Sequence, residues 1–267
     1  MMMQSHQDMK SNNKFIKIEK FFKKLPKQIN IELQKYRRFY VTNKKKNIFD
    51  PVTNIDKNIE KFIRRKIVSV FPNHKIIGEE IKNRKSKSDY TWFIDPIDGT
   101  KNLILGVPLW SNLIGLFYKD KSIISLANFP MLKTFYLAYG GKTFKFENNK
   151  RKVLLSNKKI RKKINITLNT LRPIENSKIR KIQKTHKGIF KISGIDALNF
   201  CLVAEGKIDI LIEKGLKQVD FFPLISIIEN SGAIISDWQG KKRFNDGDVL
   251  VSGNKKNHLK FLKFLKK

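Results

Sequence analysis

The spacing of hydrophobic and polar positions predicts two helical regions at the start of the chain. Apolar residues recur at helical spacing between residues 14 and 40, and Pro26 is expected to divide this stretch into two helices. A second apolar stripe predicts a helix over residues 56–71, which Pro72 ends. Residues 1–13 are expected to form a disordered tail.

Runs rich in β-branched and aromatic residues predict strands in the middle of the chain. They cover residues 75–78, 90–94, 110–118, 122–129 and 134–139, and a hairpin is expected over residues 141–165. The pattern after residue 193 predicts a helix over 197–205, a strand over 208–212, a helix over 220–230 and a strand over 233–237. This mixture of helices and antiparallel-looking strands predicts a layered α+β protein.

Composition supports a folded protein of the cytoplasm. Of the 267 residues 40% are hydrophobic, which is enough to bury a core. No run of about 18 uncharged apolar residues occurs, so no membrane-spanning helix is expected. The polar start lacks the apolar stretch of a secretory signal, and a single cysteine, Cys201, fits a reducing compartment.

The charge of the chain is strongly positive, with 56 Lys and Arg against 23 acids, a net +33. Taken alone, this excess would suggest a nucleic-acid partner. Only 10 of the basic residues are Arg, the type that nucleic-acid sites favour, and Lys is spread over nearly every segment. We therefore interpret the charge as a compositional bias and expect no nucleic-acid partner. Residues 151–191, with 14 basic residues and one acid, Glu175, are the exception and could form a positive surface.

The candidate chemistry lies in acids at turn positions, since eight of the 23 acids fall within residues 50–98. In DPIDGT (95–100), Asp95, Asp98 and the Ile97 carbonyl can converge on a hard cation such as Mg²⁺. Gly99 and Thr100 then offer N–H groups and a hydroxyl that suit a phosphate oxygen. An Asx turn that caps a helix would use the same residues, and both interpretations stay open at this point.

Other acids could complete such a site. GEE (78–80) follows a predicted strand, Asp56 precedes a helix within DPVTNID (50–56), and Asp220 lies at a predicted helix start, where it could also be only a cap.

Five segments together resemble the inositol monophosphatase superfamily in order and spacing over roughly residues 30–260. They are DPVTNID (50–56), GEE (78–80), WFIDPIDGTKN (92–102), GIDALN (194–199) and EKGLKQVD (213–220). Residues 106–116 and 215–241 are most similar to the bacterial histidinol-phosphatase branch. Lys44 also fits that branch, with Lys45 as an alternative alignment. Residues 200–209 also occur in close form in the nucleotide bisphosphate phosphatases of the superfamily.

The resemblance implies a layered αβαβα sandwich of the inositol monophosphatase and fructose-1,6-bisphosphatase type. It would form one catalytic domain over residues 14–267, with a metal-site half over about 14–140 and a second half over about 141–267. It also implies a homodimer that hydrolyses a small phosphorylated substrate, with two or three Mg²⁺ in each active site.

The resemblance assigns roles residue by residue. Glu79, Asp95 and the Ile97 carbonyl would hold a first Mg²⁺, and Asp95, Asp98 and Asp220 a second, which matches the two-metal logic of in-line displacement. Glu79 would accept a proton from the attacking water, helped by a relay through Thr100 and Asp56.

The substrate would be held on two sides, and Lys44 would be an accessory group. Asp98, Gly99 and Thr100 would bind its phosphate. The residues expected near its alcohol are Gly194, Ile195, Asp196 and Glu213. Acids there suit the amine and imidazole of histidinol phosphate, although a helix N-cap would equally explain Asp196.

Three hypotheses follow. The first is a Mg²⁺-dependent histidinol-phosphate phosphatase of histidine biosynthesis. The second keeps the chemistry with inositol 1-phosphate or a 3′(2′),5′-bisphosphonucleotide as the substrate, the latter mildly favoured by the basic residues 151–191. The third is a non-catalytic polyanion-binding protein, which the intact acids argue against. The family pattern is broken next to Asp220, where Val219 replaces the usual Trp and Phe221 and Phe222 replace small residues.

Overall fold

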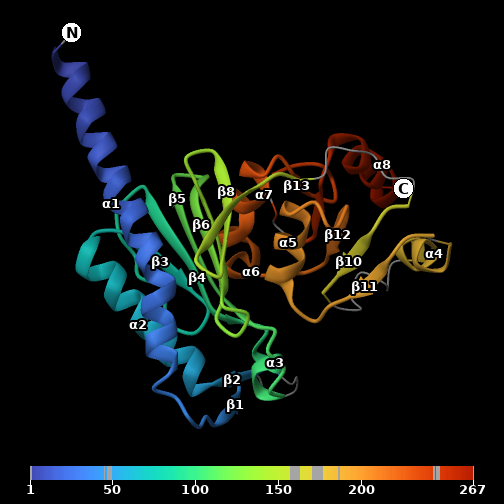
Figure 1. Ribbon diagram of the computed structural model, residues 1–267, viewed down its shortest axis with the longest axis horizontal. Coiled ribbons are helices and arrows are strands. Elements are labelled where there is room, and N and C mark those ends of the chain that lie inside the picture. The colour runs from blue at the N-terminus through green and yellow to red at the C-terminus, as the bar shows by residue number, and fades with distance from the viewer. Residues whose placement is uncertain are drawn as a thin grey trace.

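The protein is built of five layers, in the order helix, sheet, helix, sheet, helix (Figure 1). The computed structural model describes residues 2–44, 46, 50–156, 163–169, 177–185, 187–242, 244 and 247–266. This arrangement confirms the αβαβα sandwich and the α+β class that the sequence predicted.

The larger sheet has seven strands in sequential order, and only its first pair is parallel. Its strands are β3 (Lys75–Gly78), β4 (Tyr90–Asp98), β5 (Ser111–Tyr118), β6 (Lys121–Phe129), β7 (Thr134–Tyr139), β8 (Lys142–Glu147) and β9 (Lys150–Leu154). Its central strands are buried on both faces, because Trp92 of β4 faces one helix layer while the adjacent Phe93 faces the other. The strands predicted from residue 75 to 139 are confirmed.

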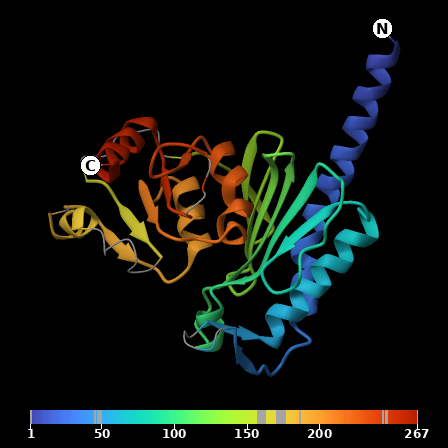
Figure 2. The same cartoon turned by 180° about the vertical axis from the view of Figure 1, so that it is seen from behind.

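Helices α1 (Met2–Leu33) and α2 (Asn54–Val70) cover the outer face of this sheet (Figures 1 and 2). Helix α1 begins at Met2, within the segment predicted as a tail, and its first turns project away from the sheets. The expected division at Pro26 is wrong, since the helix runs through this residue. A proline inside a helix costs about 3 kcal/mol, and the full burial of Phe22, Leu25 and Ile29 around it offsets this cost.

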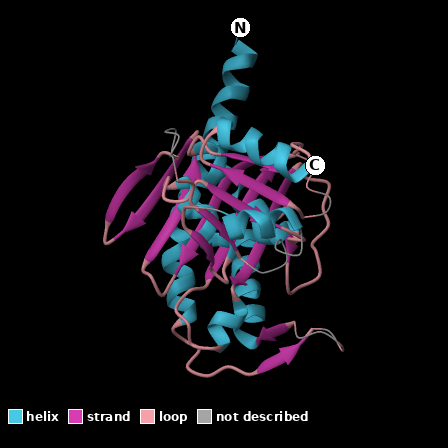
Figure 3. Ribbon diagram, turned by 90° about the vertical axis from the view of Figure 1, so that its right-hand side faces the viewer, coloured by secondary structure: helices cyan, strands magenta, loops and turns pink. Residues whose placement is uncertain are grey.

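The second sheet lies across a middle layer of helices from the first. Its strands, in the order β11-β10-β12-β14-β13, are β10 (Ile166–Leu168), β11 (Phe190–Ile192), β12 (Ile210–Glu213), β13 (Ile234–Asp237) and β14 (Val249–Ser252). The middle layer contains α5 (Asp196–Ala204), α6 (Gln218–Phe221) and α7 (Ile225–Asn230), and α4 (Ser177–Thr185) and α8 (Lys255–Lys266) form the last layer. A small ribbon of β1 (Val41–Asn43) and β2 (Pro51–Thr53) lies near α3 (Thr100–Ile104) at one end of the molecule (Figures 1 and 3).

The single helix predicted over residues 220–230 is interrupted. A 3₁₀ turn over Phe222–Leu224 separates α6 from α7, because Pro223 has no N–H to continue the helical hydrogen bonds. Gly115 of β5 allows this turn to approach closely, since a Cβ there would lie 2.7 Å from Cα of Pro223. Among the described residues, no helix is long and apolar enough to cross a membrane.

The outer helix layer should depend on Phe22, which is fully buried and stacked on Trp92 with ring centroids 5.2 Å apart. We expect Phe22→Ala to lower the free energy of unfolding by about 3–5 kcal/mol, because it leaves a cavity in this core. Urea unfolding measures the loss, and Phe39→Ala, at a side chain that is 39% exposed, is the control. Equal effects of the two changes would contradict the packing described here.

Candidate metal centre and active site

Three carboxylates from separate elements meet beside the end of the larger sheet. Glu79 directly follows β3, Asp95 lies in β4, and Asp220 lies in α6. One oxygen from each side chain lies within 4.8 Å of the other two. They line a cavity of about 370 Å³ that also contains Asp98 and Ile97. The structure thus brings together the full set of residues that the sequence proposed as metal ligands.

An irregularity in β4 presents two of these acids to the same cavity. Asp95 pairs with Leu113 of β5 and Asp98 pairs with Ser111, so two residues of β4 stand opposite one residue of β5. In a regular strand, successive side chains point to opposite faces of the sheet. A bulge interrupts this alternation and changes the direction in which the side chains point. The N–H of Ile97 donates to Oδ1 of Asp95 at 3.0 Å, which fixes the Asp95 carboxylate within the bend.

Asp98 is held by two donors from other elements. Its Oδ2 accepts from the Ser111 hydroxyl at 3.2 Å and from the N–H of Ala197 at 3.0 Å. Gly99 follows with a φ of +88°, and a Cβ there would lie 3.2 Å from the Leu109 carbonyl oxygen. Only glycine adopts this turn without strain, so it brings the start of α3 to the edge of the cavity.

Burial and mutual repulsion act on the carboxylates together. Burial, with the charges of Glu79, Asp98 and Asp220, raises the pKa of Asp95 well above its ordinary value. Burial also raises the pKa of Asp98 to about 6 and, with the nearby Glu79, the pKa of Asp220 to about 7. A cluster of oxygen donors that repel one another fits a hard divalent cation, and the Ile97 carbonyl adds a neutral donor.

Glu79 is kept ionised by two lysines. Its Oε1 accepts from Nζ of Lys44 at 3.0 Å and from Nζ of Lys217 at 2.8 Å. Burial alone would raise the pKa of Glu79, but these two ammonium groups outweigh it and lower the pKa. Glu79 therefore differs from the other acids of the cluster, because it remains a proton acceptor at neutral pH.

The loop that carries Glu79 is anchored on α2. Glu60 is fully buried and accepts from Nε of Arg64 at 2.7 Å. Its other oxygen accepts from the N–H of Glu80 at 2.7 Å. These two hydrogen bonds of Glu60 fix the chain next to Glu79, a role that the sequence did not predict for Glu60.

The predicted relay pair is in contact. The Thr100 hydroxyl donates to Oδ1 of Asp56 at 2.9 Å and lies 3.1 Å from the Ile97 carbonyl. Asp56 is fully buried at the start of α2, where its Oδ2 accepts from the N–H and the hydroxyl of Thr53. These bonds align the Thr100 oxygen toward the cavity, which Thr100 also lines.

The side of the cavity away from these candidate metal ligands is also acidic. Asp196, at the start of α5, and Glu213, at the end of β12, are both buried and line it. Burial raises the pKa of each carboxyl well above its ordinary value. Oδ1 of Asp196 and Oδ1 of Asn169 are buried with no hydrogen-bond partner among the described residues.

Some expected site residues lie outside this cavity. Gly194 and Ile195 lie in the turn that leads into α5, where Ile195 is fully buried in the core. Lys44 does not line the cavity, but its Nζ contacts Glu79 and Glu80. Its alternative, Lys45, and residues 157–162, 170–176 and 186 of the basic stretch 151–191 lie outside the described residues, so that surface stays a prediction.

The structure also adds two residues to the site. Lys217, which contacts Glu79, could have been noticed as a cation three residues before Asp220. Asn169, whose N–H donates to Glu213, follows β10 in a stretch that carries no sequence signal.

Comparisons with known proteins agree on one family. The model of the inositol monophosphatase family matches residues 5–267. The chain is 33% identical over 215 residues to the chloroplastic bifunctional phosphatase IMPL2 of Arabidopsis thaliana, covering 79% of this chain and 61% of IMPL2. It is 31% identical over 215 residues to a histidinol-phosphatase of Chlorobaculum parvum, covering 76% and 79% of the two chains. The crystal structure of an IMPase/NADP phosphatase complexed with Mg²⁺ and phosphate has the same fold, with a TM-score of 0.81, 23% identity and coverage of 94% and 95%.

The raised pKa values predict how stability depends on pH. The folded-state pKa values of Asp98, about 6, and Asp220, about 7, exceed the ordinary 3.8, so folding takes up protons in this range. In EDTA, the free energy of unfolding should therefore rise as pH falls from about 8 to about 5. Urea unfolding across this range measures the slope.

Two variants show whether this pH dependence of the free energy of unfolding comes from the buried carboxylates or from the overall charge of the protein. Asp220→Asn should flatten it, whereas Asp89→Asn, at an exposed acid, should leave it unchanged. At pH 8, Mg²⁺ should stabilise the unaltered protein and do so far less in Asp220→Asn. A slope that Asp220→Asn does not change would contradict the repulsion described here.

Proposed function

The chain belongs to the inositol monophosphatase family, and from this premise we propose that it hydrolyses histidinol phosphate in a Mg²⁺-dependent reaction. Membership makes it a phosphatase by family, while the substrate is our proposal. The corresponding role would be a step of histidine biosynthesis in the cytoplasm, carried out by a homodimer.

The residues present fit the divalent ions that this chemistry needs. Glu79, Asp95 and the Ile97 carbonyl would hold one Mg²⁺, and Asp95, Asp98 and Asp220 would hold a second. Bound there, Mg²⁺ would neutralise phosphate charge and acidify a water molecule. The repulsion among the buried acids supports this assignment, since a divalent cation relieves it.

The protein groups around the ions have separable roles. Gly99 and Thr100, where α3 begins, would orient the phosphate through backbone N–H groups. Glu79, kept ionised by its lysines, would accept the proton of the attacking water. Asp56, which accepts a hydrogen bond from the Thr100 hydroxyl, would orient the Thr100 oxygen. The two residues would thereby act as a relay that helps the transfer of the water proton to Glu79.

The observation that carries the substrate assignment is the set of unpaired acceptors near the leaving alcohol. Oδ1 of Asp196 and Oδ1 of Asn169 are buried without a donor among the described residues, and Glu213 lies in the same cavity. A buried acceptor without a donor costs about 1–3 kcal/mol, so this pocket favours an alcohol that brings N–H donors and positive charge. Histidinol supplies an ammonium group and an imidazole, whereas inositol supplies only neutral hydroxyls.

The comparisons support this choice of substrate without deciding it. One similar protein is named a histidinol-phosphatase and another a bifunctional phosphatase. A bisphosphonucleotide is disfavoured at this end of the cavity, because its second phosphate would face Asp196 and Glu213. Inositol 1-phosphate is the second candidate, since hydroxyl groups can also donate to the free oxygens.

The proposal can be tested by measuring phosphate release with and without Mg²⁺. The substrates to compare are histidinol phosphate, inositol 1-phosphate and 3′-phosphoadenosine 5′-phosphate. We expect selective, Mg²⁺-dependent hydrolysis of histidinol phosphate. Preference for another of these substrates would be consistent with the proposed mechanism but would overturn the assignment of histidinol phosphate as the substrate.

Variants of the alcohol pocket test the same point at single residues. Glu213→Gln and Asp196→Asn should each raise KM for histidinol phosphate by about 10- to 100-fold, since each removes a carboxyl group that would ionise against the bound ammonium or imidazolium. KM for inositol 1-phosphate should change much less. Asp89→Asn, at an exposed acid, controls for the loss of one negative charge. Equal changes in KM for both substrates would contradict a role in recognising a cation.

A further inference from the structure

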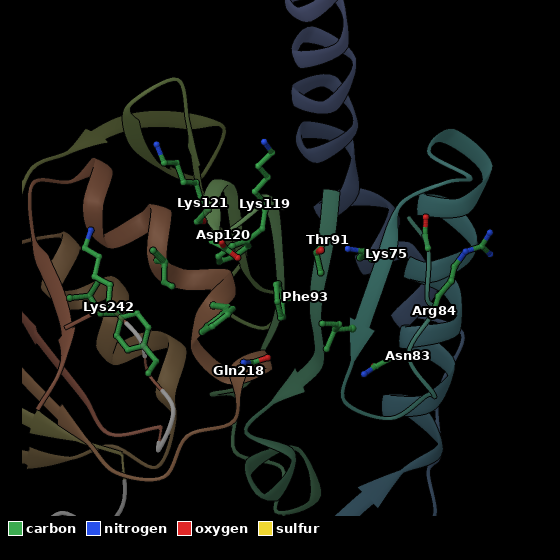
Figure 4. Close-up of a pocket in the computed structure, with 18 of the residues that line it drawn as sticks. Lys75, Asn83, Arg84, Thr91, Phe93, Lys119, Asp120, Lys121, Gln218 and Lys242 are labelled. Atoms are coloured by element: carbon green, nitrogen blue, oxygen red, sulfur yellow. The ribbon is translucent and has the colours of Figure 1, made fainter. Parts of the chain in front are cut away.

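A second and larger cavity, of about 1080 Å³, lies between the larger sheet and the α6–α7 segment (Figure 4). We call it the basic cleft. Its floor contains Phe93, Phe117 and Phe222, and six cationic side chains line the cleft. One of them, Lys242, is paired with Glu229, and the other five are called the rim cations: Lys75, Arg84, Lys85, Lys119 and Lys121.

The floor of the basic cleft is a packed aromatic cluster. The rings of Phe117 and Phe222 stack with centroids 5.2 Å apart, and Phe93 packs edge-on against both, at 5.0 and 4.8 Å. Polar side chains stand beside this floor, and Figure 4 shows Thr91 and Gln218 among them. A ligand with a flat apolar body and hydrogen-bonding edges would fit such a surface.

The rim carries more positive charges than the acidic side chains in the cleft can neutralise. Lys75 and Arg84 lie on one side of the cleft, whereas Lys119 lies in the turn between β5 and β6 and Lys121 begins β6 (Figure 4). Within the described part of the chain, none of the five rim cations forms an ion pair. Of the two acids in the lining, Glu229 is already paired with Lys242, which leaves Asp120.

We propose that the basic cleft binds a polyanion with a flat aromatic body, the chemical class of the nucleotides. The spread of cations over two sides of the cleft calls for more than one negative charge. The volume, about 1080 Å³, slightly exceeds the range of about 300–1,000 Å³ that is typical of ligand pockets, so a nucleoside triphosphate fits with room to spare. This site is separate from the phosphatase cavity and does not rest on the substrate proposed above.

The ligand would lie against elements that carry the metal ligands. Phe93 is two residues before Asp95, and Gln218 and Phe222 are each two residues from Asp220. In the short α6 segment, Gln218 lines the basic cleft while Asp220 lines the acidic cavity. A ligand in the cleft would therefore protect α6 and the middle of β4 from local opening.

Binding of a fluorescent ATP analogue, followed by anisotropy in EDTA at physiological salt, tests the site. EDTA keeps the acidic cavity free of divalent ions. We expect saturable binding that the double change Lys119→Gln with Lys121→Gln weakens at least about tenfold, because charge-assisted contacts to phosphate are lost. Lys133→Gln with Lys150→Gln removes the same charge from exposed positions elsewhere, a turn and the start of β9, and should leave binding unchanged.

Two further measurements place the ligand. Asp95→Asn should retain binding, and hydrogen exchange should slow in residues 91–94 and 218–224 when the analogue binds. No saturable binding at millimolar analogue would overturn the proposal. Equal weakening by both lysine pairs would also overturn it, as would binding that Asp95→Asn abolishes. Each of these outcomes is independent of which phosphate ester the enzyme hydrolyses.

Discussion

The electrostatic repulsion among four carboxylates is the constraint on which the rest of the structure depends. Glu79, Asp95, Asp98 and Asp220 share one small cavity, and burial strengthens their repulsion because little water is present to screen it. Without opposing interactions the cluster would take up protons or open. The fold supplies such interactions from several layers, and a divalent cation would supply the remainder.

The opposing interactions come from elements far apart in the chain. Lys44 and Lys217 neutralise Glu79, the Lys217 N–H donates to Asp220 at 2.7 Å, and the N–H of Ala197 donates to Asp98. The layered fold brings them together, because the start of α5 and the start of α6 meet the β4 irregularity at the same end of the larger sheet. Stability in the core therefore maintains a site that is itself destabilising in the absence of metal.

The sequence was sufficient to propose the candidate metal ligands but not the residues that surround them. Asp95, Ile97 and Asp98 could be proposed because they fall together in one short motif, DPIDGT, which the structure places at the end of β4. The contacts of Lys217 and Asn169, and the floor of the basic cleft, depend on residues brought together by the layers, so no local pattern reports them. At Pro26 local propensity predicted a break, but burial of the surrounding helix prevailed.

The most direct test of the central claim is a crystal structure of the protein soaked with Mn²⁺, a Mg²⁺ analogue whose anomalous scattering locates it. The account predicts anomalous peaks bounded by Glu79, Asp95, the Ile97 carbonyl and Asp220, with at least one of the two lysines displaced from Glu79. An empty cavity at saturating Mn²⁺, with both lysines still on Glu79, would contradict it.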